Sequence, residues 1–158
     1  MTVAFVGIGS NLQDPVRQVR DAIAELDHVP HTRVVKHSSL YRTAPVGHTA
    51  QPDFINAVAQ LETGLPAERL LAELQQIERS HRRARSFANA PRTLDLDVLL
   101  YGAAELSQPE LQIPHPRMHE RAFVLKPLLE IAPDVSIPGR GAAKVLLEQC
   151  AGQKVEKA

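Results

Sequence analysis

The sequence has one cysteine, no net charge and no long hydrophobic run. Cys150 has no second cysteine with which to form an intramolecular disulfide, which fits a reducing compartment. The 18 Lys and Arg residues balance 18 Asp and Glu residues, so no global field draws the chain to nucleic acid or to an anionic membrane. No stretch reaches the roughly 20 apolar residues of a membrane span, and no basic segment followed by an apolar run opens the chain. We therefore expect a cytoplasmic protein with neither nucleic acid nor membrane as partner.

Three motifs of nucleotide and nucleophile chemistry are also absent. The segment Gly7-Ile-Gly9 lacks the third glycine of the dinucleotide fingerprint. The chain contains no Gly-x-x-x-x-Gly-Lys-Ser/Thr phosphate loop and no Gly-x-Ser-x-Gly nucleophile elbow. Any bound nucleotide must therefore be held without a P-loop.

Length and composition describe an ordinary globular chain. With 158 residues, 44% of them hydrophobic and 23% charged, the sequence predicts one domain over residues 1–158 with a full hydrophobic core. We expect this domain to act as a monomer.

The order of predicted elements indicates the fold class. Strands are expected at 2–9, 33–43, 54–61 and 94–101, and helices after Asp14-Pro15 and after Pro66. The order strand, helix, strand, strand, helix, strand predicts an α+β fold with a ferredoxin-like split β-α-β core. Both helices would pack on one face of an antiparallel sheet, leaving the other face open. The proline-punctuated last third is expected to elaborate this core, with a short helix at 142–149 and a frayed polar tail at 152–158.

Asp95 and Asp97 stand at alternate positions of the last predicted strand. Alternate side chains of a strand share a face, about 6.5–7 Å apart along the backbone, so Leu96 and Val98 would face the core. Magnesium takes oxygen ligands and binds through one or two carboxylates together with substrate phosphates. The alternative is an edge strand whose charges discourage pairing with other chains.

The segment before this strand is rich in arginine. No acidic residue lies between positions 79 and 92, which contain Arg79, Arg82, Arg83, Arg85 and Arg92. Because the planar guanidinium binds phosphate through two hydrogen bonds, this segment favours a polyphosphate ligand beside the acidic strand. A solvated basic face is the alternative, above all for Arg79 and Arg82.

A second basic segment runs from His115 to Arg121. His115 and His119 are four residues apart, but Pro116 and the absence of His-Glu-x-x-His argue against a zinc site. We expect one of these histidines to donate a hydrogen bond to phosphate, and His119 to be an ordinary surface residue if it is not that donor.

Aromatic residues make up only 4% of the sequence, and a core role is the default for each of them. Phe54 and Asn56 share a strand face by the same alternation, and Phe123 lies in the last third. The sharper hypothesis is that two rings enclose a flat heterocycle while the Asn56 amide, a donor and an acceptor, reads its edge.

Taken together, these segments closely resemble the 6-hydroxymethyl-7,8-dihydropterin pyrophosphokinase family of folate biosynthesis. The resemblance covers the chain from about Thr2 to Pro138. It is carried by the segments Gly9-Ser-Asn-Leu12, Ser39-Leu-Tyr-Arg-Thr43, Pro52-Asp-Phe-Ile-Asn56, Ala90-Pro-Arg-Thr-Leu-Asp-Leu-Asp97, Ile113-Pro-His115 and Arg121-Ala-Phe-Val-Leu125.

The resemblance implies transfer of the β,γ-pyrophosphoryl group of ATP to the pterin hydroxymethyl oxygen, with release of AMP. Asp95 and Asp97 would hold two Mg2+ ions, with Asp97 also a candidate general base, and the catalytic residues would be Arg83, Arg92, Asp95 and Asp97. Nucleotide contacts are implied for Gln75, Glu78, Arg85, Arg92, Val98, His115 and Arg121. Pterin contacts are implied for Thr43, Ala44, Val46, Phe54, Asn56, Asp95 and Phe123.

Two other readings remain open at this point. One is a ferredoxin-like nucleic-acid-binding module, although such modules expose stacking aromatics on the sheet where this chain carries two carboxylates. The other is a metal-dependent nucleotidyl- or phosphotransferase that acts on a different alcohol.

Overall fold

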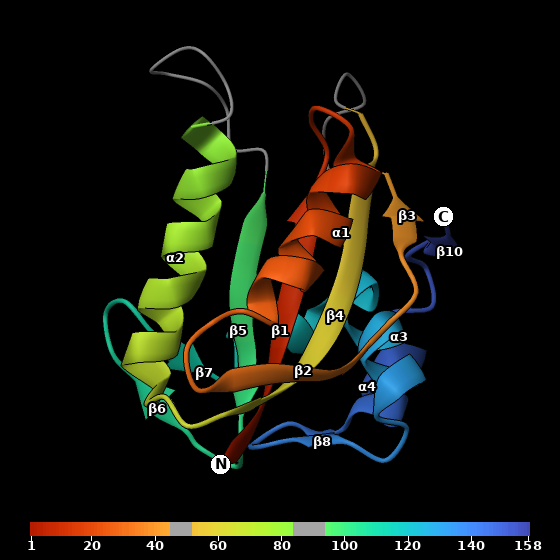
Figure 1. Ribbon diagram of the computed structural model, residues 1–158. Coiled ribbons are helices and arrows are strands. Elements are labelled where there is room, and N and C mark those ends of the chain that lie inside the picture. The colour runs from red at the N-terminus through yellow and green to blue at the C-terminus, as the bar shows by residue number, and fades with distance from the viewer. Residues whose placement is uncertain (45–51, 84–93) are drawn as a thin grey trace.

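The computed structural model describes residues 1–44, 52–83 and 94–158, with the backbone alone at Arg83. The chain folds as an α+β protein, as predicted (Figure 1). Its elements are β1 (Thr2–Ser10), α1 (Pro15–Leu26), β2 (Thr32–His37), β3 (Tyr41–Thr43), β4 (Phe54–Thr63), α2 (Ala67–Arg83), β5 (Asp95–Tyr101), β6 (Leu106–Ser107), β7 (Gln112–Ile113), the 3-10 helix η1 (Met118–Glu120), α3 (Ala122–Ile131), β8 (Ser136–Ile137), β9 (Gly141–Ala142), α4 (Ala143–Glu148) and β10 (Glu156–Lys157).

The main sheet is antiparallel and has the strand order β10-β3-β4-β1-β5, with β2 also paired to β4. The strand predicted at 33–43 is divided in two because Ser38 interrupts it. The Ser38 N–H donates to the Val58 carbonyl at 2.8 Å, and the Ser38 hydroxyl accepts from the Val58 N–H at 2.9 Å. The serine side chain thus replaces a backbone carbonyl of the ladder, and β2 and β3 pair with different parts of β4.

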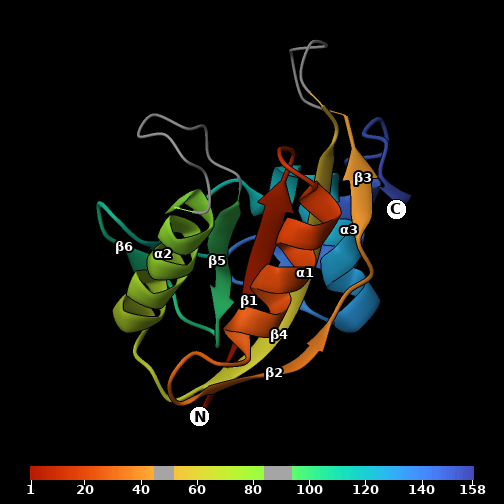
Figure 2. The same cartoon turned by 45° about the horizontal axis from the view of Figure 1, so that its top comes forward.

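Helices α1 and α2 pack on one face of the sheet, as predicted (Figure 2). Asp14 caps α1 by accepting from the Arg17 N–H at 3.4 Å, and Pro15 occupies the first turn. The helices and the sheet enclose a core that includes Val6, Leu26, Leu61, Leu70, Leu74, Leu96 and Val98.

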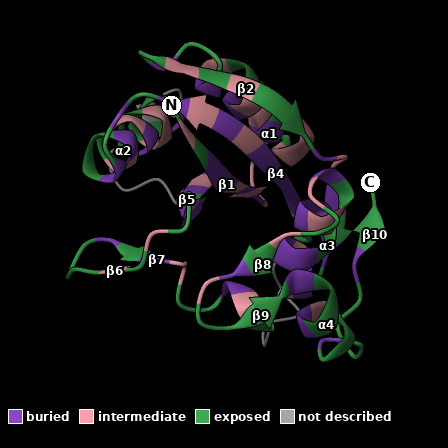
Figure 3. Cartoon of the chain, turned by 90° about the horizontal axis from the view of Figure 1, so that it is seen from below, coloured by how far each residue is buried: buried purple, intermediate pink, exposed green. Residues whose placement is uncertain are grey.

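The prediction of an open second face was right only in part. Helix α3 packs on this face at β3 and β4, and α4 packs on α3, so a second helical layer lies on the opposite side of the sheet from α1 and α2 (Figure 3). A second core forms there from Phe5, Tyr41, Val58, Leu99, Leu100, Met118, Leu125 and Leu128. The sequence concealed α3 because Pro127 lies inside the helix, where proline removes a backbone donor and argues against helical structure.

The prediction of a frayed C-terminal tail was also wrong. Strand β10 pairs with β3, the Ala158 N–H donates to the Leu40 carbonyl at 2.8 Å, and Val155 is buried in the second core. The short helix predicted at 142–149 is confirmed as α4. None of the helices in the described part of the chain combines the length and the apolar composition that a membrane span needs.

Candidate active site

A cavity of about 850 Å3 opens where the end of the sheet meets the layer that contains α3. Its walls come from β1, β3, β4 and β5, from the segment 115–124 and from the C-terminal tail. The cavity brings together the predicted site residues Thr43, Ala44, Phe54, Asn56, Asp95, Asp97, His115, Arg121 and Phe123.

Strand register sets the floor of this cavity. Gly9 pairs with Asn56 on one side and Asp95 on the other, and Gly7 likewise lies between Val58 and Asp97. Directly opposed residues of an antiparallel pair point to the same face. Because the central strand carries glycine at both positions, neighbouring side chains approach its backbone closely. An added Cβ would lie 3.3 Å from Leu99 Cδ2 at Gly7 and 2.9 Å from Asn56 Oδ1 at Gly9.

The acidic strand β5 lies at the edge of the sheet, as the edge-strand alternative required, yet its carboxylates line the cavity. Asp95 is half-buried and Asp97 is exposed, while Leu96 and Val98 are buried in the core behind them, as alternation predicted. A register shift against β1 follows, so that both Leu99 and Leu100 join the second core.

Helix α2 supports the outer side of this edge strand. The Leu96 N–H donates to Glu78 Oε2 at 2.8 Å. Glu78 thereby serves as the acceptor that a further strand would have supplied, and it holds the backbone between Asp95 and Asp97.

One wall of the cavity is cationic. Arg117 and Arg121 line it together with His115, and the charge of Asp97 acts on both His115 and Arg121. Burial lowers the pKa of His115, and the nearby arginines lower it further against the opposing effect of Asp97. Burial and Arg117 likewise lower the pKa of Arg121. Two arginines thus share a concave site with two carboxylates, as an anionic ligand bound through a metal would require.

The hydrogen bonding of His115 determines which ring nitrogen carries the proton. The ring Nδ1 of His115 accepts from the backbone N–H of Arg117 at 3.1 Å. The backbone N–H of His115 donates to the Leu99 carbonyl at 3.0 Å and so fixes the position of the residue. A neutral ring that accepts at Nδ1 carries its proton on Nε2. His115 is therefore held as a donor through Nε2, which agrees with its predicted role toward phosphate.

At the other end of the cavity, Asn56 has a fixed orientation. Its Nδ2 donates to the buried Thr43 hydroxyl at 3.0 Å, which leaves Oδ1 over Gly9, where an added Cβ would approach it to 2.9 Å. The Arg121 guanidinium carbon lies 5.5 Å from the centre of the Phe123 ring. The side wall thus combines an aromatic face with a cation.

Some predicted site residues lie elsewhere. Val98 is buried between the sheet and the helices, Gln75 is exposed on α2, and Glu78 contacts β5, so none of the three lines the cavity. Their nucleotide contacts stay predictions. Val46, Arg85, Arg92 and the Arg83 side chain fall outside the described residues.

Sequence reasoning missed several lining residues. Gly7 and Gly9 had a detectable signal, since glycines at alternate strand positions indicate close approach of a ligand or of another backbone. Arg117 lies in the basic segment His115 to Arg121, which was its signal. Gln153, Lys154 and Val155 had none, because only tertiary contacts of the tail, among them its pairing with β3, bring it to the cavity.

The donor set fits magnesium better than zinc. In the described segments, no group of three or more His, Cys, Asp or Glu side chains is arranged to hold a metal ion. Two carboxylates on one strand suit Mg2+, which takes its remaining ligands from water and substrate phosphates.

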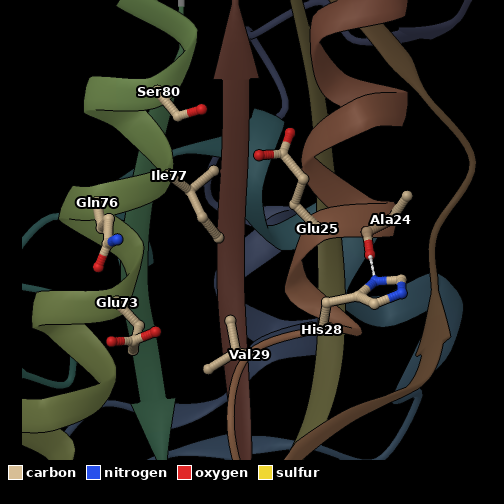
Figure 4. A pocket seen from close by; sticks show the side chains of 8 residues that line it. All are labelled: Ala24, Glu25, His28, Val29, Glu73, Gln76, Ile77 and Ser80. Carbon is tan, nitrogen blue, oxygen red and sulfur yellow. Dashed lines mark hydrogen bonds between the residues drawn. The ribbon is translucent and has the colours of Figure 1, made fainter.

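A smaller cavity, of about 410 Å3, lies between α1 and α2 (Figure 4). It is lined by Glu25, His28, Glu73 and other helical residues, and the His28 ring bonds its own helix at the Ala24 carbonyl, 2.9 Å away. It contains none of the predicted site residues, so we place the site in the larger cavity.

The fold and the larger cavity define a class: a ferredoxin-like α+β protein whose sheet carries paired carboxylates in a cavity that basic side chains also line. The sequence model of the 7,8-dihydro-6-hydroxymethylpterin-pyrophosphokinase family matches residues 5–133, and the chain belongs to this family. The resemblance inferred from the sequence, and with it the prediction of a pyrophosphokinase-type enzyme, is confirmed.

Curated relatives agree over nearly the whole chain. The chain is 43% identical to a 2-amino-4-hydroxy-6-hydroxymethyldihydropteridine pyrophosphokinase of Haemophilus influenzae, over 99% of this chain and 98% of the relative. It is 42% identical to the Pseudomonas aeruginosa protein of the same name, over 97% of this chain and 94% of the relative.

Solved structures confirm the fold. A crystal structure of an HPPK-DHPS protein in complex with substrates superposes with a TM-score of 0.74 at 11% identity. The Plasmodium falciparum HPPK-DHPS wild type with pteroate gives a TM-score of 0.75 at 12% identity. Each match covers 94% of this chain, which spans less than half of those longer chains, at 43% and 42%.

Proposed function

We propose that the protein transfers pyrophosphate from ATP to the hydroxymethyl group of 6-hydroxymethyl-7,8-dihydropterin and releases AMP. The observation that carries the proposal is the position of Asp95 and Asp97. They line one cavity together with Asn56, two phenylalanines, His115 and Arg121. One end of this cavity suits a flat polar heterocycle and the other suits a metal-bound polyphosphate.

Asp95 and Asp97 are the residues that would hold two Mg2+ ions. Bound there, the ions would neutralise the charge of the triphosphate and align its reacting phosphorus with the acceptor. Without such cations the two carboxylates would repel the phosphates. An anionic substrate can therefore bind beside the acidic strand only when metal ions neutralise this repulsion.

The reaction needs positioning and charge neutralisation rather than a covalent intermediate. The hydroxymethyl oxygen forms a bond to the β-phosphorus and loses its proton, for which Asp97 is the candidate acceptor. The bond between the β-phosphorus and the oxygen that bridges it to the α-phosphorus breaks, and AMP leaves with that oxygen.

The cationic wall would bind the transferred phosphates. The Nε2–H of His115 and the guanidinium of Arg121 are donors from residues that line the same cavity as Asp97. We propose further contacts from Arg83, Arg85 and Arg92, and nucleotide contacts from Gln75, Glu78 and Val98.

The pterin would occupy the floor between β4 and β5. Phe54 and Phe123 supply aromatic faces, and the Asn56 amide, oriented by Thr43, supplies a hydrogen-bonding edge. Ala44 lines the same end, and we extend the pterin contacts to Val46. Gly9, which adds no side chain between Asn56 and Asp95, supports this position for a planar ring.

Small molecules fit this cavity better than nucleic acid does. A ferredoxin-like nucleic-acid module uses an open sheet face, whereas α3 packs on that face here at β3 and β4. We propose that residues 1–158 act as one monomeric domain in the cytoplasm.

The decisive assay combines the protein, Mg2+, ATP and 6-hydroxymethyl-7,8-dihydropterin and separates the adenine nucleotides by chromatography. We expect AMP and a pyrophosphorylated pterin in equal amounts. Formation of ADP would identify transfer of a single phosphoryl group, and AMP formed only with a different alcohol would identify the rival transferase. Either result overturns the proposal.

A further inference from the structure

Arg121 occupies an unusual junction in the wall of the cavity. It ends η1 and is also the N-cap of α3, with an extended backbone at φ −118° and ψ 106°. The first N–H groups of a helix need acceptors from outside the helix. Arginine has donors only, so its side chain cannot cap α3, and it makes no capping hydrogen bond.

The missing acceptor comes from the C-terminal tail. Gln153 Oε1 accepts from the Ala122 N–H at 2.9 Å, and Gln153 Nε2 donates to the Glu120 carbonyl at 2.8 Å. One amide group therefore bonds the residue before Arg121 and the residue after it. This pair of bonds restrains the backbone from which the guanidinium extends into the cavity.

Gln153 is itself held in place by the tail. Its N–H donates to the Cys150 carbonyl at 2.9 Å, and the Cys150 and Val155 side chains are both buried in the second core. The Lys126 ammonium donates to the Val155 carbonyl at 2.8 Å, and β10 then pairs with β3. The glutamine thus lies between two anchored points of the chain.

We propose that Gln153 is a positioning residue of the active site, which holds Arg121 in place for the polyphosphate. The guanidinium lies in the field of Asp97, which attracts it, and of Arg117, which repels it, so its position depends on a restrained backbone. The proposal rests on the proposed function, in which Arg121 binds the triphosphate. Gln153 lies outside residues 5–133, the stretch that matches the family.

The test is a double-mutant cycle read out by binding of a non-hydrolysable ATP analogue with Mg2+, measured by calorimetry. Gln153→Met removes both hydrogen bonds at similar side-chain volume. Since a net hydrogen bond contributes about 0.5–1.5 kcal/mol, we expect the Kd to rise roughly three- to tenfold. In an Arg121→Ala background the same change should alter Kd less than about twofold, because the residue that it positions is gone.

The matched control is Gln149→Met, which changes an exposed glutamine beyond the end of α4 and should leave the Kd as in the wild type. If Gln153→Met raised the Kd by the same factor in the wild-type and the Arg121→Ala backgrounds, Gln153 would not act through Arg121. An unchanged Kd would show that it has no role in binding. Either result overturns this inference while the wild type still binds the analogue, whereas a wild type that binds no analogue overturns the proposed function and this inference together.

Discussion

At the scale of single residues, charges and missing side chains shape the site. Asp95 and Asp97 present carboxylates from one strand face, His115 presents an Nε2–H donor, and Gly9 adds no side chain between Asn56 and Asp95. Each feature depends on one atom or one small group. Single substitutions are therefore expected to change binding or turnover with little effect on the fold.

Asp95→Asn and Asp97→Asn each replace a charged metal ligand with a neutral isostere. We expect turnover to fall by at least about 100-fold, the usual order for removal of one charge-stabilising group, with an unchanged unfolding temperature. Steady-state rates at saturating Mg2+ and thermal unfolding check this. Asp134→Asn, at an exposed turn after α3, should be neutral. Turnover near the wild-type value in both active-site variants would contradict the metal-binding role.

Gly9→Ala tests the floor of the cavity. The new Cβ would lie 2.9 Å from Asn56 Oδ1, so the amide must move. Because a displacement of about 1 Å in a site can cost up to about 100-fold, we expect the pterin KM to rise at least about tenfold. Binding of the ATP analogue should change little. Gly152→Ala, whose Cβ meets nothing within 4 Å, is the matched control. A wild-type pterin KM for Gly9→Ala would place the ring elsewhere.

At the scale of elements, helices fix the strands that carry the site. Glu78 on α2 accepts the Leu96 N–H of the edge strand β5. Glu130 on α3 accepts from the Ser39 N–H and hydroxyl and from the Tyr41 hydroxyl, and so ties α3 to the start of β3. Both carboxylates act on backbone or side chains next to the cavity rather than within it.

Glu78→Leu should loosen the backbone between the two aspartates. Residues that orient ligands typically affect activity by 10- to 100-fold, so we expect turnover to fall about tenfold with only a small loss of stability. Glu78→Gln keeps a carbonyl acceptor and should recover most of the rate. Glu73→Leu, on the same helix but beside the smaller cavity, should be neutral. If Glu78→Gln were as impaired as Glu78→Leu, the negative charge rather than the hydrogen bond would be responsible.

Glu130 predicts a pH dependence of stability. Burial acts to raise the pKa of its carboxyl, but hydrogen bonds from Tyr41 and Ser39 and the charge of Lys157 leave that pKa below its usual value. A carboxyl whose pKa is lower in the folded state stabilises the protein above its ordinary pKa, and this stability is lost as the pH falls. Glu130→Gln should therefore be less stable than the wild type at pH 7.

The difference in urea midpoint between Glu130→Gln and the wild type should shrink below about pH 4.5, the ordinary range of a glutamate carboxyl. Glu148→Gln, on the exposed side of α4, should follow the wild type at every pH. If the difference in urea midpoint stayed constant from pH 7 to pH 3, Glu130 would stabilise the protein by packing and not by its charge.

At the scale of the whole molecule, one sheet carries two hydrophobic cores, and the site lies where the second of them ends. Helices α1 and α2 build the first core, and η1, α3, α4 and the tail build the second. A ligand in the cavity would contact both the sheet and this second layer, and its binding should therefore stabilise the folded chain as a unit.

Thermal unfolding can measure how much ligand binding stabilises the folded chain. At 100 times its Kd, a ligand adds about 2.7 kcal/mol, which should raise the Tm of a chain of this size by about 5–10 °C. We expect that shift with an ATP analogue and Mg2+, and we expect EDTA to abolish it. The same shift in EDTA would show that the nucleotide binds without metal at Asp95 and Asp97.

The sequence by itself determined the first layer of the fold and the chemistry of the acidic strand. Alternation placed Asp95 and Asp97 on one face and Leu96 on the other, and proline and caps marked the starts of α1 and α2. These signals are local, since they depend on strand and helix periods and on neighbouring residues.

Only the tertiary structure decided that α3 packs on the second face, that Gly7 and Gly9 lie between β4 and β5 in the cavity, and that Gln153 reaches the backbone around Arg121. These features join residues far apart in the sequence: Gln153 is 31 positions from Ala122, and Glu130 is 91 from Ser39. No local periodicity encodes such pairs. They form because burial of the second core brings the segments together, and that burial depends on the packing of the whole chain.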